Sequence, residues 1–115
     1  MTFYIGKDNS SDTLNYDYYE GDYGVEVEDE VLDCVYRVRE KIPFKGDVLY
    51  QIDPYSDVVI PLKELQQIVD TINYVLKASL LKNCREDDAE DELRALSEIS
   101  LSAIRQGKNL VSFGD

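Results

Sequence analysis

The chain has 115 residues, 43% of them apolar, and its 24 acidic and 12 basic side chains give a net charge of −12. Such a length and apolar content predict one domain, residues 1–115, around a single hydrophobic core. The charge disfavours nucleic acid and anionic membranes as partners, because both require a basic surface. The chain has no histidine, which removes the commonest general base and most zinc sites.

The two cysteines, Cys34 and Cys84, do not have the spacing of metal ligands. Because each lies in or beside an expected helix, we expect two free, mostly buried thiols in a reducing compartment. The amino-terminal residues show no secretory signal, and no apolar stretch reaches the ~18 residues that a membrane-spanning helix needs. These features predict a soluble cytoplasmic protein.

In chain order, residues 3–5 are expected to form a short strand or an ordered arm, and residues 7–24 a long acidic, tyrosine-rich loop. A loop of more than about 15 residues in a compact domain is typically functional or disordered. Residues 27–41 follow as a helix, because their apolar side chains recur at spacings of three and four. Its acidic first turn and basic last turn match the helix dipole.

Residues 47–53 alternate between polar and apolar side chains, which predicts a strand closed by a turn at 53–55. Residues 58–60 form a short apolar stretch. Pro61 is expected to be the first residue of a core helix that runs to about residue 82. An acidic run at 86–92 begins a last helix, Gly107 ends it, and residues 110–113 form a terminal strand. The order predicts an α+β fold, a single compact domain with three main helices and a few short strands.

The acidic side chains are concentrated in one part of the chain. Between Lys7 and Arg37 there is no basic residue, whereas ten carboxylates and five tyrosines occur there, four of the tyrosines within residues 16–23. Tyrosine combines an apolar ring with a polar tip and is enriched at the cores of protein interfaces. This composition indicates a surface that binds a basic partner. The tyrosines also have a structural interpretation, in which they pack the loop onto the domain, and the two interpretations are compatible.

Metal binding and catalysis are less favoured. Neither acidic run has the ligand pattern of an EF-hand, and acidic residues at 86–92 are also expected simply because they begin a helix. No nucleophile motif, phosphate-binding loop or dinucleotide fingerprint is present. We therefore expect a protein that is not an enzyme, with no cofactor and no metal. Tyr36, Tyr50 and Tyr74 lie in expected helices or strands, where core or half-buried packing is expected.

In its whole-chain profile, small, histidine-free and strongly acidic with acid and tyrosine interleaved, the chain resembles immunity proteins of bacterial toxin–immunity systems, including those of contact-dependent inhibition. The resemblance rests on no diagnostic motif. It implies a non-catalytic inhibitor that binds a cognate basic toxin domain, such as a nuclease. The residues of suitable type for that contact are Asp12, Tyr16, Asp17, Tyr18, Tyr19, Glu20, Asp22, Tyr23 and Glu26.

A second contact segment is expected at the acidic run 86–92, because a standard interface of roughly 1,600 Å² exceeds what one loop provides. The chain is expected to be a monomer or a weak dimer. Two alternatives stay open. A secretion-system chaperone would bind an effector segment as a homodimer, and a nucleic-acid mimic would present rows of carboxylates to a DNA-binding protein.

Overall fold

The computed structural model of the chain describes residues 1–6, 24–85 and 87–114. The described part is a small antiparallel sheet with helices packed against it, and three of its α-helices are substantial. This architecture confirms the α+β fold class that the sequence predicts. Within the described ranges, no helix is both long enough and apolar enough to cross a membrane.

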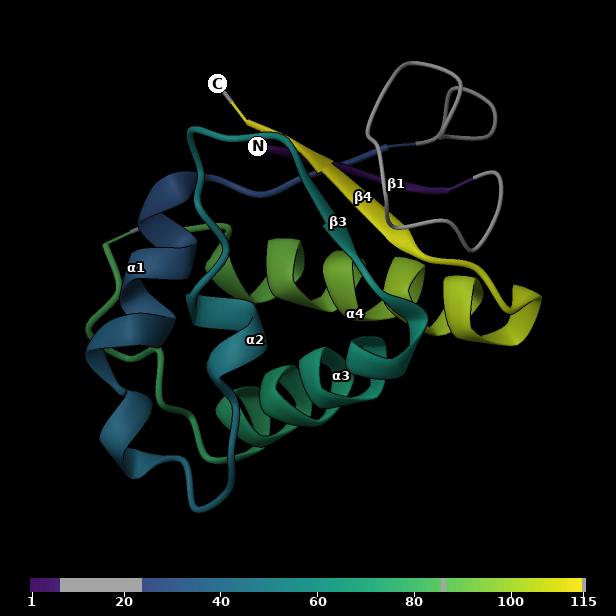
Figure 1. Cartoon of the computed structure of the whole chain (residues 1–115). Helices are drawn as coiled ribbons and strands as arrows, with labels where there is room; N and C mark the ends of the chain where they lie inside the picture. Colours follow the sequence, from purple (N-terminus) through teal and green to yellow (C-terminus); the bar gives the residue numbers. More distant parts are fainter. Residues whose placement is uncertain (7–23, 86, 115) are drawn as a thin grey trace.

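The sheet joins the two ends of the chain. Its strands are β1 (Thr2–Ile5), β2 (Val25–Glu26), β3 (Val58–Ile60) and β4 (Leu110–Phe113). They lie in the order β2-β1-β4-β3, so the first and last strands are neighbours at the centre (Figure 1). Because alternate side chains share a face of a strand, Phe3 of β1 and Leu110 of β4 both reach the hydrophobic core. The strands expected near each end of the chain are confirmed.

The helices are α1 (Asp29–Arg37), α2 (Asp47–Tyr50), α3 (Leu62–Lys77) and α4 (Ala89–Gln106), with a short 3₁₀ turn, η2 (Arg39–Lys41), after α1. α4 packs against α3 and also against β1 and β2, whereas α1 stands at one end of the molecule (Figure 1). The fully buried side chains at the centre come mainly from α3 and α4: Leu65, Ile68, Ile72, Leu93 and Leu96.

The helix ends follow the sequence signals in part. α4 ends at Gly107, whose φ of 68° is the left-handed conformation that glycine adopts readily. α3 begins one residue after Pro61 and ends at Lys77 rather than near residue 82. Ser79 takes a left-handed φ of 54°, which ends the helical path, and the residues beyond it form turns.

The strand expected at residues 47–53 is wrong, because the segment begins with the single helical turn α2. Leu49 and Ile52 are both buried and lie three residues apart, so a helical turn directs both into the core. The turn is fixed against α3, since the Val48 amide donates a 2.9 Å hydrogen bond to Gln67 Oε1. The alternation over residues 47–53 did not distinguish a short strand from a helical turn. Contacts with the rest of the fold select the turn.

The free thiols expected at Cys34 and Cys84 are also wrong, because the two residues form a disulfide. Their Cα atoms lie 5.7 Å apart although 50 residues separate them in sequence. The bond joins α1 to the connection between α3 and α4. Tyr36 is a smaller correction: its side chain is 45% exposed and stacks under the Arg39 guanidinium. Tyr50 and Tyr74 are half-buried, as expected.

Candidate functional site

The structure places one of the predicted partner-binding residues. Glu26 lies on β2 opposite Thr2 of β1, and its side chain is exposed. Among the described strands, β2 lies at an edge of the sheet. The other predicted partner-binding residues lie outside the described residues: Asp12, Tyr16, Asp17, Tyr18, Tyr19, Glu20, Asp22 and Tyr23.

Glu26 does not stand alone, because β2 lies beside the first turns of α4. Together they line a shallow, open surface hollow of about 380 Å³, which we call the acidic hollow. Its lining brings together two acidic segments that are far apart in the sequence, the end of the first acidic run and the run at 86–92. The lining residues are Gly24, Val25, Glu26, Asp88, Asp91, Glu92 and Ala95.

Backbone contacts fix the β2 side of the acidic hollow. Val25 pairs with Phe3 of β1 and is buried, so the strand is held from beneath. Beyond the strand, the Val27 amide donates a 2.9 Å hydrogen bond to the Met1 carbonyl, and the Met1 amino group donates to the Val27 carbonyl at 3.1 Å. The position of Glu26 is therefore set by the sheet rather than by a loose loop.

The α4 side is fixed by burial and by one hydrogen bond to the segment that precedes α1. Ala89 and Leu93 are buried and hold the first turns of α4 on the core. The Glu28 amide donates a 2.6 Å hydrogen bond to Glu92 Oε1. This bond links the residue before α1 to the first turn of α4, and it orients one carboxylate of the hollow.

The carboxylates of the acidic hollow differ in their ion pairs. Arg94 forms an ion pair with Asp91 at 3.3 Å, and both side chains are largely exposed. Across the ranges 1–6, 24–85 and 87–114, Glu26 and Asp88 have no ion pair. A structural explanation covers part of the pattern, because acidic residues at the start of α4 interact favourably with the helix dipole. That explanation does not cover Glu26, which lies on a strand.

The chemistry open to the acidic hollow is attraction of cations. In the described part of the chain, no group of His, Cys, Asp and Glu side chains has an arrangement suited to a metal ion. Carboxylates without metal-site geometry can accept hydrogen bonds from Lys and Arg side chains, and such charge-assisted bonds are stronger than neutral ones. The acidic hollow is therefore suited to the basic side chains of a protein.

Comparison with protein-family models, with curated proteins and with solved structures gave no match. Function is therefore inferred from the residues of this chain. The sequence already indicated both acidic segments, one through its lack of basic residues and the other through its density of acids. It did not indicate that Glu26 lies beside Asp88 and Asp91, because the register of β2 and the packing of α4 decide that contact.

Proposed function

We propose that this protein is a non-catalytic acidic binding protein, and specifically an immunity protein that binds and neutralises a cognate basic toxin domain. The observation that carries the proposal is the acidic hollow, where Glu26 from one acidic segment lies beside Asp88 and Asp91 from the other. A nuclease toxin needs a basic cleft for its phosphate substrate. An inhibitor that presents carboxylates at that cleft would block the substrate.

Charge and apolar contact are expected to contribute differently to the rate and the affinity of binding. An exposed ion pair contributes only about 0–1 kcal/mol, so the carboxylates alone do not make a tight complex. Their main effect would be on speed, since complementary charge raises association rates toward ~10⁸ M⁻¹s⁻¹ at low salt. Affinity would come from aromatic anchors. The tyrosines predicted for contact, Tyr16, Tyr18, Tyr19 and Tyr23, lie outside the described residues and precede Gly24, which lines the hollow, by one to eight positions in the sequence.

The chaperone alternative requires a different kind of surface. A chaperone that holds an effector segment needs an exposed apolar groove and usually a dimer. In the described ranges, the exposed large apolar side chains are Tyr36, Phe44 and Tyr55. Tyr36 and Phe44 already pack edge-to-face on Tyr50 and Tyr74. These aromatic residues do not favour the chaperone, and a monomer in sedimentation equilibrium would argue further against it.

Cytoplasmic residence stays a prediction, and the disulfide opposes it. Disulfides persist in oxidising compartments and are rare in the cytosol, where thioredoxin and glutathione keep thiols reduced. Alkylation of the protein directly in lysed cells, followed by mass spectrometry, would report whether Cys34 and Cys84 are bonded there. A bonded pair would favour an immunity protein that acts outside the cytosol.

The experiment that tests the function begins with capture of a partner from the native host, with the full chain as bait. Capture alone does not decide the question. The proposal expects a basic protein that is released by salt, that arrests growth when expressed alone, and that is harmless when this chain is co-expressed. A captured protein that is not toxic, or whose toxicity this chain does not relieve, would contradict the proposal.

A further inference from the structure

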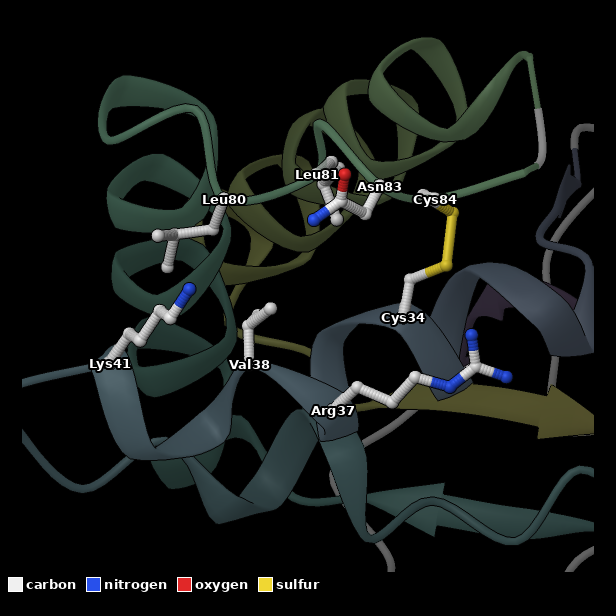
Figure 2. Close-up of a pocket in the computed structure, with 8 residues that line it drawn as sticks. All are labelled: Cys34, Arg37, Val38, Lys41, Leu80, Leu81, Asn83 and Cys84. Atoms are coloured by element: carbon white, nitrogen blue, oxygen red, sulfur yellow. A yellow bond between two sulfur atoms is a disulfide. The ribbon is translucent and has the colours of Figure 1, made fainter.

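A second hollow lies on a different part of the molecule, beside the disulfide, and its volume is about 290 Å³. One wall comes from α1 and η2, and the other from the connection that follows α3 (Figure 2). We call it the disulfide cavity. Its lining residues are Cys34, Arg37, Val38, Lys41, Leu80, Leu81, Asn83 and Cys84.

The disulfide holds the two walls of this cavity together. Cys34 is 4% exposed and lies in α1, and its bond to Cys84 fixes the opposite wall at that end (Figure 2). Leu81 is 8% exposed and anchors the same wall to the hydrophobic core. The cavity is therefore preformed rather than a gap between two independent loops. Ligand sites of small molecules are typically preformed in this way, with volumes of about 300–1,000 Å³.

The charge around the disulfide cavity is opposite to that of the protein. Residues 37–45 and 77–85 together hold seven of the twelve basic residues of the chain and one acidic residue, Glu40. The basic residues are Arg37, Arg39, Lys41, Lys45, Lys77, Lys82 and Arg85. These two segments carry a net charge of +6 (7 − 1) and include every lining residue of the cavity except Cys34, which directly follows Asp33. Away from the Arg37 end, the charge of these segments therefore favours an anion, although the net charge of the chain is negative.

The basic groups that line the cavity are not equivalent. Arg37 forms ion pairs with Asp33 and Glu30, at 2.5 and 3.7 Å, so two carboxylates already occupy its guanidinium. The side chains of Lys41 and Asn83 have no ion pair or hydrogen bond to any residue in 1–6, 24–85 or 87–114. Their side chains extend toward the cavity from opposite walls, whereas Arg37 extends along α1 toward the disulfide (Figure 2).

We propose that the disulfide cavity binds a small organic anion that carries a short apolar chain. The anionic group, a carboxylate or a phosphate, lies between the Lys41 ammonium and the Asn83 amide, both of which can donate hydrogen bonds. The apolar chain packs on Val38, Leu80 and Leu81. The Arg37 end of the cavity does not hold the anion, because Asp33 and Glu30 would repel it.

The size and the charge of the cavity select this class of ligand. Its volume lies just below the usual range for small-molecule sites, so the cavity suits a small ligand and a folded protein surface cannot enter it. Nucleic acid does not fit either, since a polyanion would also face the negative charge of the rest of the chain. This inference is independent of the proposed immunity function, because none of its residues lines the acidic hollow.

The test is a titration of the isotopically labelled full chain with hexanoate, hexyl phosphate and hexanol, followed by amide chemical shifts. Hexanoate or hexyl phosphate should cause saturable shifts in residues 37–41 and 80–84, and hexanol should bind at least tenfold more weakly. The tighter of the two anions identifies the headgroup. Absence of saturable shifts with both anions, or equal binding of hexanol, would overturn the proposal.

Matched variants separate the site from general charge attraction. Lys41→Gln removes the cation that lines the cavity and should weaken binding of the anion by roughly tenfold. Lys82→Gln makes the same change of charge on an exposed residue that does not line the cavity, and it should leave affinity within about twofold of wild type. Equal losses in the two variants would show diffuse attraction and would contradict the assigned site.

Discussion

The Glu28 amide donates a 2.6 Å hydrogen bond to Glu92 Oε1, across 64 residues of sequence. Glu28 is the N-cap residue of α1, and Glu92 lies in the first turn of α4. The bond therefore links the starts of two helices at the point where β2 passes into α1. Because Glu92 also lines the acidic hollow, this contact positions part of the candidate binding surface.

Glu92→Ala should lower the free energy of unfolding by about 1 kcal/mol, since it removes the acceptor of this hydrogen bond. Glu92→Gln keeps an oxygen acceptor and should lower the free energy of unfolding by less than Glu92→Ala. Urea denaturation of both variants measures the difference, and hydrogen exchange at the Glu28 amide reports the bond directly. If exchange at Glu28 is unchanged in Glu92→Ala, the amide does not depend on Glu92.

Loss of the disulfide should lower the free energy of unfolding more than Glu92→Ala does. Cys34→Ser combined with Cys84→Ser should destabilise the protein by about 2–4 kcal/mol, because the bond closes a long loop and limits the unfolded chain. Urea denaturation of the wild type with and without a thiol reductant should give a similar difference. Alkylation of both cysteines in the folded, non-reduced protein would show that the bond is absent.

Close packing at Gly46 gives a prediction about the α2 turn. A Cβ atom at this position would lie 2.8 Å from Thr71 Oγ1, so Gly46→Ala should push α2 away from α3 and cost about 1–3 kcal/mol. Thr71→Ala removes the hydroxyl and methyl groups that would collide. The double variant should therefore be more stable than the sum of the single effects. If urea denaturation shows that the stability losses of the two single variants simply add, the close approach of Gly46 to Thr71 is contradicted.

Asp53 gives a prediction about pH. The Tyr55 amide and, to a smaller extent, the Ser56 hydroxyl donate hydrogen bonds that lower the pKa of the Asp53 carboxyl. A lowered pKa in the folded state means that the contribution to stability is present above the unfolded pKa of about 3.9. It is lost as the pH falls through the lower folded pKa.

Titration of the Asp53 carboxyl carbon by NMR tests this directly. The midpoint in wild type should lie below that of an unfolded aspartate, and Ser56→Ala should move it upward because one donor is lost. An Asp53 midpoint at or above the unfolded value would show that the turn at 53–56 does not stabilise the charged form.

Regular helices were the most predictable part of this fold. Leu65 and Ile72 of α3 recur at helical spacing, as do Leu93 and Leu96 of α4, and all four are buried. In such segments the helical spacing of the apolar residues matches their burial over many residues, so the local sequence is enough to predict the helix. Residues 47–50 were not predictable in the same way, because contacts with Gln67 and Thr71 of α3 select the turn. Likewise, no local signal places Cys34 beside Cys84.

The candidate site was predictable only in its composition. Acidic residues near Glu26 and near Asp91 are visible in the sequence, and their abundance indicates a basic partner. Their proximity depends on the pairing of Glu26 with Thr2 and on the docking of α4 against the sheet. Those are long-range contacts, which the spacing of residues within either segment does not encode.

The most direct test of the immunity proposal compares two triple variants in the toxicity rescue and binding assays. Glu26→Gln, Asp88→Asn and Asp91→Asn together remove three charges from the acidic hollow. The control removes the same charge from exposed acids that do not line the acidic hollow, through Glu40→Gln, Asp70→Asn and Glu98→Gln.

We expect the hollow variant to associate with the captured basic domain at least tenfold more slowly at low salt and to rescue growth poorly, because steering by opposite charge is lost. The control should bind and rescue like the wild type, apart from a small change in rate. Equal behaviour of the two variants, with binding intact in both, would contradict the acidic hollow as the binding surface.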